Sequence, residues 1–354
     1  MKYRLLGNSG LRVSELALGT MTFGDDWGWG SPKEEARKIY DAYREAGGNF
    51  IDTANFYTGG SSERFVGEFM APHRAEVVLA TKYSNAVPGK DANAGGNQRK
   101  SMVQAVEASL KRLGTDYIDL YWLHAWDQIT PAEEVMRAFD DLVRAGKILY
   151  IGISDAPAWV VAKSNTLAEL RGWTRYVGLQ INYSLLERTV ERELIPVAKD
   201  QGMTVVAWSP LHNGLLTGKY LPENKSAASG ATRLDSEMMK GFASADKSGL
   251  VETDDSGLRT VREVVAIAKE MGVSAAQVAL AWLRHRSVPV IAIVGARKLS
   301  QLQDNLKSLE IAFSPEQLRR LDDVSAVPMG FPHDLLSGVI RGTVFGGMRD
   351  EIIA

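Results

Sequence analysis

Short apolar runs alternate with longer segments of helical periodicity along most of the chain. Nearly every position in the short runs is apolar, which is typical of strands buried on both faces of a parallel sheet. Eight such strands are predicted, at residues 16–18, 49–52, 77–81, 118–123, 148–153, 178–181, 204–208 and 290–294.

Helical segments separate these strands, at residues 31–45, 100–113, 131–145, 157–168, 190–201, 258–271 and 274–284, and a further helix begins near Leu299. The first carries the usual start signals, with Ser31 as N-cap, Pro32 at the first helical position and acidic residues in the first turn. Strands alternating with helices predict a parallel sheet, and eight such units predict a closed (β/α)8 TIM barrel. An open doubly wound sheet is the alternative, but the glycines of residues 19–24 lack the spacing of its fingerprint.

Three segments lie outside this barrel count. The residues before Leu16 are typical of a hairpin with Asn8-Ser9-Gly10 as its turn, which we expect to cover the bottom of the barrel. Residues 218–256 are too long for an ordinary connection and predict a lid or surface excursion. Residues 329–354 form a C-terminal tail without clear periodicity. We therefore expect residues 1–354 to form a single barrel domain with extensions.

Composition and charge exclude several classes of function. The chain has 354 residues, and its formal net charge of −2 leaves no basic field for a phosphate backbone, so we expect no nucleic-acid partner. The absence of cysteine excludes disulfides, cysteine nucleophiles and thiolate metal sites. The N-terminus has no signal-like run, and the longest apolar stretch, residues 288–296, is too short to span a membrane. We expect no membrane partner and a cytoplasmic location.

Four polar residues of distinct chemistry fall at or just beyond the ends of neighbouring predicted strands. Asp52 ends the second strand and Tyr57 follows it, while Lys82 ends the third strand and His124 follows the fourth. The C-terminal strand ends of a barrel carry its chemistry, so all four are expected on one rim. An ammonium lowers the pKa of a nearby phenol, a histidine orients a carbonyl, and an aspartate keeps a buried lysine charged. The set is suited to protonating a carbonyl oxygen while a nicotinamide cofactor delivers hydride, which no side chain supplies.

Taken singly, each of the four has a simpler structural explanation. Asp52 fits a helix N-cap, Lys82 a solvated lysine, His124 a hydrogen-bonded structural histidine, and Tyr57 a packing residue. Their meeting on one rim is what favours function, so the interpretation depends on the barrel. No metal site is predicted, because the histidines lack metal-ligand spacing; they are His73, His124, His212, His285 and His333.

The segments around these residues resemble the aldo-keto reductase family. Residues 49–57 (NFIDTANFY) are similar to the family's strand with its Asp and Tyr, and Ala80-Thr81-Lys82 is similar to its lysine strand. Residues 106–121 lead into Leu123-His124 as the family's histidine motif does. The resemblance extends from about Tyr3 to about Asp323. It implies that Tyr57 is the general acid/base, that Lys82 and Asp52 tune it, and that His124 orients the substrate carbonyl.

The resemblance also implies cofactor positions. Asp155 stands where the family usually has Asn, and a carboxylate can accept from the carboxamide NH2 but cannot donate to its carbonyl. Trp208 matches the aromatic residue that stacks on the nicotinamide, although a core tryptophan at a strand end is the alternative. The nicotinamide end is expected to involve Gly19, Thr20, Met21, Asp52, Ser154, Asp155, Gln180 and Trp208.

The phosphate and adenosine end is implied by two further segments. Residues 209–211 followed by 214–220 resemble the family's pyrophosphate loop, where backbone N–H groups and Lys219 could face phosphate. Arg297 and Lys298 directly precede a helix, and two cations at a helix N-terminus suit a 2′-phosphate, so NADP is preferred and NAD stays possible. Gln301 replaces an arginine of many members, which weakens that preference. The residues expected here are Ser209, Pro210, Leu211, Gly214, Lys219, Gly295, Arg297, Gln301, Asp304 and Asn305.

Aromatic residues near the rim are expected to bind a substrate. Trp27, Phe56 and Trp126, together with Trp29, are interpreted as walls for a ring-shaped or hydrophobic carbonyl compound, and packing on the rim explains them equally well. By resemblance, the tail is expected to close over this pocket.

The predicted function is that of an NADP-dependent carbonyl reductase or alcohol dehydrogenase, whose partner is a small aldehyde, ketone or alcohol. Two alternatives stay open. One is a nucleotide-binding regulatory subunit resembling potassium-channel β subunits. The other is a barrel aldolase in which Lys82 forms a Schiff base.

Overall fold

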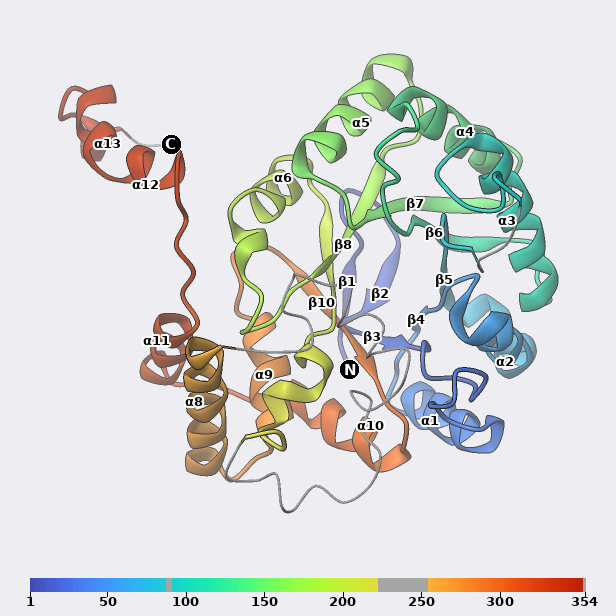
Figure 1. Ribbon diagram of the computed structural model, residues 1–354, viewed down its shortest axis with the longest axis horizontal. Coiled ribbons are helices and arrows are strands. Elements are labelled where there is room, and N and C mark those ends of the chain that lie inside the picture. Colours follow the sequence, from blue (N-terminus) through green and yellow to red (C-terminus); the bar gives the residue numbers. More distant parts are fainter. Residues whose placement is uncertain (87–90, 222–253, 353–354) are drawn as a thin grey trace.

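The computed structural model describes residues 1–86, 91–221 and 254–352, and its centre is a closed barrel of parallel strands (Figure 1). Each strand pairs with the next along the chain, and the last closes on the first. The strands are β3 (Leu16–Gly19), β4 (Phe50–Asp52), β5 (Val78–Tyr83), β6 (Ile118–Leu123), β7 (Ile148–Ser154), β8 (Tyr176–Asn182), β9 (Thr204–Trp208) and β10 (Val290–Gly295). The predicted (β/α)8 barrel is confirmed, with each predicted strand in its place.

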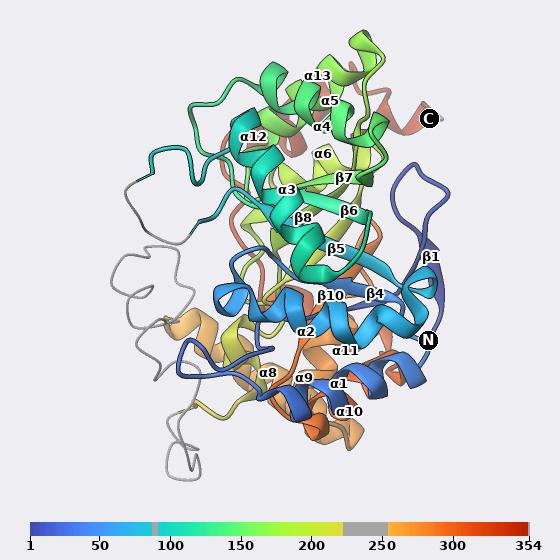
Figure 2. The same cartoon turned by 90° about the vertical axis from the view of Figure 1, so that its right-hand side faces the viewer.

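Helices surround the barrel, as both ribbon views show (Figures 1 and 2). They are α1 (Lys33–Glu45), α2 (Ser61–Met70), α3 (Arg99–Leu113), α4 (Ala132–Arg144), α5 (Ala158–Arg171), α6 (Leu194–Asp200), α8 (Asp255–Met271), α9 (Ala275–Leu283), α10 (Leu299–Leu306) and α11 (Pro315–Val324). Short 3-10 turns join them, at η1 (Tyr57–Gly60), η2 (Ala71–Glu76), η3 (Thr189–Glu191), η4 (His212–Thr217) and η7 (Lys307–Glu310).

Two helix predictions need correction. Ser31 is not the N-cap of α1: Pro32 holds that position, and the Ser31 hydroxyl donates to the Arg297 carbonyl at 3.0 Å. Ser31 therefore ties the first long loop to the end of β10. The helix predicted at residues 190–201 is divided into η3 and the shorter α6. By contrast, the helix predicted at residues 274–284 is present as α9, and Ser274 is its N-cap, because the Ser274 hydroxyl accepts from the Gln277 N–H at 3.2 Å.

The barrel interior is filled around Trp122, which is fully buried. Gly152 and Gly178 on the two following strands leave room for its ring. A Cβ atom built on Gly152 would lie 2.2 Å from Trp122 Cζ3, and one on Gly178 would lie 2.8 Å from Trp122 Cη2. Trp122 pairs in register with Lys82, so this packed layer directly adjoins the rim that carries the polar residues.

The N-terminal hairpin covers the bottom of the barrel, as predicted. Its strands β1 (Tyr3–Leu5) and β2 (Arg12–Ser14) pair antiparallel. The Gly7 N–H donates to Thr204 Oγ1 at 2.7 Å, at the first residue of β9, and Leu6 packs into the barrel interior. Figure 2 shows the hairpin at the end of the barrel away from the long connecting loops.

The C-terminal tail stands apart from the barrel mouth (Figure 1). It contains α12 (His333–Ser337), α13 (Val339–Val344) and η8 (Arg349–Glu351). Its contacts are with the α6 side, where Arg192 donates to the Pro328 carbonyl and His333 Nε2 lies 3.0 Å from Glu193 Oε1. The expectation that the tail closes over the pocket is therefore wrong for its described residues. The lid predicted at residues 218–256 falls mostly on residues 222–253, outside the described part.

Among the described helices, none is by itself both long and apolar enough to cross a membrane. Only α8 and α9 taken together pass by length and composition, and they are bent by 104°.

Candidate active site

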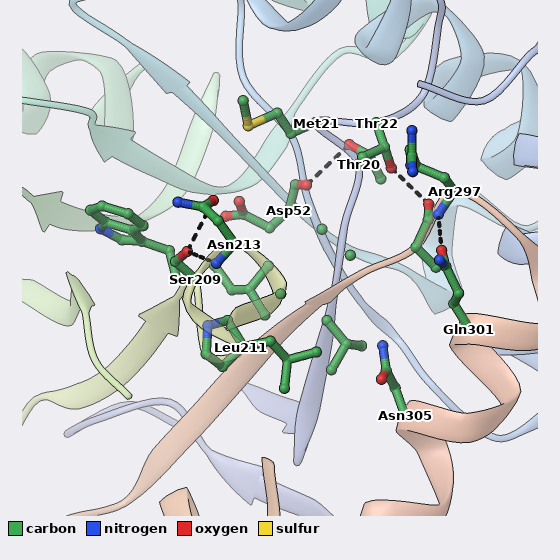
Figure 3. Close-up of a pocket in the computed structure, with 18 of the residues that line it drawn as sticks. Thr20, Met21, Thr22, Asp52, Ser209, Leu211, Asn213, Arg297, Gln301 and Asn305 are labelled. Carbon is green, nitrogen blue, oxygen red and sulfur yellow. Dashed lines mark hydrogen bonds between the residues drawn. The ribbon is translucent and has the colours of Figure 1, made fainter. Parts of the chain in front are cut away.

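A cavity of about 510 Å³ opens at the C-terminal ends of the barrel strands. This volume lies in the range of cofactor and small-molecule sites. All the residues predicted to bind a cofactor line it, although they come from segments spread between Gly19 and Asn305. Figure 3 shows this convergence, with Asp52 next to the loop of Ser209 and Asn213, Thr20 between Asp52 and Arg297, and Arg297 and Gln301 at the other end. The barrel rim brings these residues together because parallel neighbouring strands end side by side.

The Lys82 ammonium is fully buried at the inner end of the cavity and joins two of the predicted catalytic residues. It forms an ion pair with Asp52 Oδ1, lies 3.2 Å from Tyr57 Oη, and donates to the Thr53 carbonyl at 2.9 Å. The second oxygen of Asp52 accepts from Gln180 Nε2 at 3.0 Å. Lys82 is thus neither solvated nor free to move, which removes the simpler explanation for it.

Tyr57 is positioned by an unusual turn after β4. The next residue, Thr58, has a positive φ of 48°, and its hydroxyl donates to the Phe23 carbonyl at 2.7 Å. The same hydroxyl accepts from the Ser62 N–H at 3.1 Å, where α2 begins. Left-handed backbone is unfavourable for a β-branched residue, so this turn is held by its hydrogen bonds. Sequence reasoning missed the role of Thr58.

The electrostatics of this cluster differ from the sequence expectation in one respect. Burial raises the pKa of Tyr57, and the opposing effect of the Lys82 ammonium does not overcome it. Burial lowers the pKa of Lys82, but Asp52 and Tyr57 together raise it by more than burial lowers it. The pKa of Lys82 therefore lies above its usual value. The expected lowering of the Tyr57 pKa is therefore wrong for this structure: the phenol keeps its proton and the lysine its charge.

His124 completes the group, and it is neutral. Its backbone N–H donates to the Tyr83 carbonyl at 3.1 Å, which fixes it beside the end of β5. Burial and then the Lys82 charge lower the pKa of His124 well below its usual value. Its ring lies 5.8 Å from the Tyr57 ring in an edge contact, and its Nδ1 atom is buried without a hydrogen-bond partner. A neutral imidazole here can donate one hydrogen bond to a substrate oxygen.

Asp155 and Trp208 form the wall next to this cluster. Trp208 Nε1 donates to Asp155 Oδ1 at 2.9 Å, which fixes the orientation of the indole ring. The protein atoms around the cavity desolvate the Asp155 carboxyl and raise its pKa to about 6, although the Trp208 bond and the Lys82 charge oppose this. The adjacent Ser154 hydroxyl is buried without a hydrogen-bond partner. A planar ring with a carboxamide group would find a flat face and polar partners at this wall, so these residues fit a nicotinamide.

Strained backbone is concentrated at the same cavity. Asp155, Ser209 and Asn213 all have positive φ, at 43°, 52° and 54°. Each such residue costs of order 1–3 kcal/mol, and such strain is typical of functional sites. Asn213 lines the cavity although the sequence prediction omitted it.

The loop after β9 is folded more tightly than the phosphate prediction supposed. The N–H groups of His212, Asn213 and Gly214 all donate within the loop, to Ser209 O, Ser209 Oγ and Leu211 O. Figure 3 shows the Ser209–Asn213 contacts. The amides of residues 212–214 are therefore committed to the loop itself, and the charge offered by this segment comes from Lys219, which lines the cavity.

The far end of the cavity is formed by α10 and the end of β10. The Gln301 side chain accepts from the Arg297 N–H at 2.9 Å, so it shapes the turn before α10 (Figure 3). The Leu299 N–H, at the start of α10, donates to Glu35 Oε1 at 2.8 Å. A carboxylate thus already occupies part of the helix N-terminus predicted to attract phosphate. Asp304 accepts from Ser274 Oγ and Gln277 Nε2.

Some of the predicted aromatic residues line the cavity, and others pack against neighbouring aromatic rings without being part of its lining. Trp29 and Phe56 line the cavity, whereas Trp27 and Trp126 are not among its described lining residues. Trp27 instead packs on the rings of Trp29, Phe56 and Tyr57, with centroid distances of 6.2, 5.8 and 6.4 Å. Trp126 packs edge-on against the exposed Trp159 at 5.4 Å.

Other lining residues had no signal in the sequence. They are Thr22, Asn85, Ala276, Leu280, Ile293, Val294 and Ala296, whereas Thr217, which also lines the cavity, belongs to the segment predicted to face phosphate. Ala276 and Leu280 belong to α9, whose apolar pattern is that of any core helix. Over the described ranges of the chain, no group of three His, Asp or Glu residues is placed to hold a metal ion.

Comparison with known proteins agrees with this site. A family model described as the aldo/keto reductase family matches residues 15–326. Norsolorinic acid reductase stcV of Emericella nidulans is 40% identical over 92% of this chain and 81% of its own length. The aryl-alcohol dehydrogenase [NADP(+)] of Phanerodontia chrysosporium is 38% identical over 93% of this chain and 87% of its own. The uncharacterized oxidoreductase YrpG of Bacillus subtilis is 39% identical over 93% and 98%.

Proposed function

The chain belongs to the aldo/keto reductase family, and from this premise we propose that it interconverts aromatic carbonyl compounds and their alcohols with NADP(H), using Tyr57 as general acid/base. It is an oxidoreductase, and a bound nicotinamide nucleotide supplies or accepts the hydride. The observation that carries the proposal is the buried Asp52–Lys82–Tyr57 cluster beside a neutral His124 in a cavity of cofactor size.

Tyr57 is the proton donor in this proposal because it is the only hydroxyl of the cluster that is both protonated and next to a fixed cation. When its proton passes to the carbonyl oxygen, the phenolate that forms lies 3.2 Å from the Lys82 ammonium. Lys82 stabilises this negative charge in a water-poor site, where electrostatic interactions are strong. Asp52 holds Lys82 in place and charged. His124 donates a hydrogen bond to the same carbonyl oxygen.

The same electrostatics disfavour a Schiff-base role for Lys82. A nucleophilic lysine must lose its proton, and the pKa of Lys82 is raised above its usual value by Asp52 and Tyr57, against the effect of burial. The relatives stcV, the aryl-alcohol dehydrogenase of Phanerodontia chrysosporium and YrpG are named as a reductase, a dehydrogenase and an oxidoreductase, which favours an enzyme over the regulatory subunit.

The preference for NADP over NAD is proposed from Arg297. Arg297 lines the far end of the cavity, and a relative of similar sequence is named as an NADP(+) enzyme. Gln301 contributes no charge, and Glu35 opposes an anion at the start of α10. We therefore propose a moderate preference that depends mainly on Arg297.

The aromatic substrate class is proposed from Trp29 and Phe56. Both line the cavity near Tyr57, and the ring of Trp27 packs against both of their rings. Flat apolar walls favour a ring-shaped substrate, because aromatic pairs gain about 0.5–1.5 kcal/mol beyond area burial. Two relatives are named for aromatic alcohols or for norsolorinic acid, which agrees with this class.

Replacement of Tyr57 by Phe tests the proposal. The variant keeps the ring contacts with Trp27 and His124 but loses the proton, so turnover of benzaldehyde-type substrates with NADPH should fall by about 10²–10⁴-fold. Nucleotide binding, followed by quenching of tryptophan fluorescence, should remain. Unchanged turnover would remove Tyr57 from the mechanism. Tight nucleotide binding by the wild type without turnover of any carbonyl or alcohol would instead favour the regulatory subunit.

A further inference from the structure

We propose that the Asp155 carboxylate makes this protein bind the oxidised, cationic form of its nicotinamide nucleotide in preference to the reduced form. The proposal rests on the proposed function, because it requires the nicotinamide to lie at the inner end of the cavity. It adds a role that Tyr57, Lys82 and His124 do not have: Asp155 sets which oxidation state of the cofactor is held more tightly.

The position of Asp155 is determined by the fold around it. It follows β7 directly, in a left-handed backbone conformation with φ of 43°. Its N–H donates to the Gln180 carbonyl at 3.4 Å, and its Oδ1 accepts from Trp208 Nε1 at 2.9 Å. The carboxyl is accessible from the cavity and lines it together with Tyr57 and His124. It forms no ion pair within the described part of the chain, so its charge is available to a ligand.

The charge balance of this end of the cavity gives Asp155 its effect. Asp52 and Lys82 form an ion pair and cancel each other. Burial keeps Tyr57 protonated by raising its pKa, and burial together with Lys82 keeps His124 neutral by lowering its pKa. Deprotonated Asp155 therefore leaves one uncompensated negative charge here.

An oxidised nicotinamide carries a positive ring and a reduced one does not. The uncompensated Asp155 carboxylate attracts the positive ring of the oxidised nucleotide. The neutral ring of the reduced nucleotide only removes water from this carboxylate, which is unfavourable. The remaining charged groups that line the cavity, Lys219, Arg297 and Asp304, lie at the phosphate and adenosine end. That end is chemically the same in both oxidation states, so its groups act on both nucleotides alike.

The preference must also depend on pH. Desolvation by the surrounding protein atoms raises the pKa of Asp155 to about 6, so the carboxylate is present above this pH and is lost below it. The ratio of the NADP⁺ to the NADPH dissociation constant should then rise as the pH falls from 8 to 5. A 2′-phosphate also titrates near pH 6, but it does so in both nucleotides and cancels in the ratio.

Replacement of Asp155 by Asn tests the proposal by direct binding. Asn can occupy the left-handed conformation and keep a hydrogen bond to Trp208, but it carries no charge. NADP⁺ and NADPH are titrated separately at pH 8 against tryptophan fluorescence. The ratio of their dissociation constants should be on the order of tenfold higher in D155N than in the wild type, and should no longer depend on pH. Asp304→Asn is the matched control: it removes a carboxylate from the far end of the cavity and should leave the ratio unchanged.

A second measurement uses only the wild type. Calorimetric titration at pH 6 in two buffers of different ionisation enthalpy gives the protons released on binding. NADP⁺ should release more protons than NADPH, because a cation beside Asp155 lowers its pKa. Equal proton release by the two nucleotides, or an equal change of both dissociation constants in D155N, would overturn the proposal. If the wild type binds neither nucleotide, the proposed function fails instead.

Discussion

Replacing Lys82 by Met breaks an ion pair that is almost entirely shielded from water. Lys82 is fully buried and Asp52 is 2% exposed. After the replacement, the Asp52 carboxylate keeps only the Gln180 Nε2 hydrogen bond of 3.0 Å as a side-chain partner. Removal of one member of a buried pair costs about 3–5 kcal/mol, because the remaining charge is left uncompensated. Neutralising Asp52 as well removes this charge, so the double variant D52N/K82M should regain most of the lost stability.

The assay is thermal unfolding without added nucleotide, since a bound ligand would stabilise the folded state. With an unfolding entropy of about 2.1 cal/mol/K per residue, a loss of 1 kcal/mol lowers the melting temperature of this 354-residue chain by about 1.3 °C, so K82M should melt about 4–7 °C below the wild type. D52N/K82M should melt above K82M. It should nevertheless be inactive, because the cation that stabilises the Tyr57 phenolate is still missing.

Three results would each refute a part of this reasoning. A melting temperature of K82M within about 2 °C of the wild type would mean that the pair contributes little. A double variant less stable than K82M would mean that the loss comes from packing of the lysine side chain rather than from the orphaned charge of Asp52. Full turnover in the stable double variant would separate Lys82 from the proton transfer.

Three further replacements test the packing and the nucleotide selectivity. Gly152→Ala should destabilise the protein by about 1–3 kcal/mol in thermal or urea unfolding, because its Cβ would meet two atoms of the fully buried Trp122 ring at 2.2 and 2.3 Å. Gly10→Ala, which has nothing within 4 Å of its Cβ, is the control, and an equal loss in both would contradict the packing argument. Arg297→Ala should weaken NADP⁺ binding far more than NAD⁺ binding, and equal losses would exclude a 2′-phosphate contact. Glu35→Gln removes the carboxylate from the start of α10 and should strengthen NADP⁺ binding at low salt by about two- to fivefold; unchanged or weaker binding would show that Glu35 does not oppose the phosphate.

The barrel could be predicted because its information is local and periodic. Each strand is a short run of apolar residues bounded by polar or glycine-rich turns, and runs such as 118–123 and 204–208 match β6 and β9 residue for residue. Once the strands alternate with helices, parallel pairing and closure follow. The meeting of Asp52, Lys82 and His124 could then be predicted from their places at strand ends, with no knowledge of side-chain contacts.

Contacts between segments far apart in the sequence could not be predicted from local residue patterns. Ser31 has the sequence context of an N-cap, yet its hydroxyl serves the Arg297 carbonyl, 266 residues away. Glu35 has the context of an ordinary first-turn acid, yet it accepts from the start of α10 at a separation of 264 residues. Trp29 and Trp27 are two residues apart, and only their packing decides which one lines the cavity and which one supports it.

The sequence by itself determined the barrel, the order of its strands and the identity of the polar residues at its rim, because strand periodicity and chain order are properties of neighbouring residues. The tertiary structure alone decided the protonation of those residues. The ammonium of Lys82 next to Tyr57 predicts a lowered pKa, but burial reverses the direction, and the same burial neutralises His124 and raises the pKa of Asp155 to about 6. Desolvation depends on all the atoms that surround a group in space, so it cannot be predicted from the residues next to that group in the sequence.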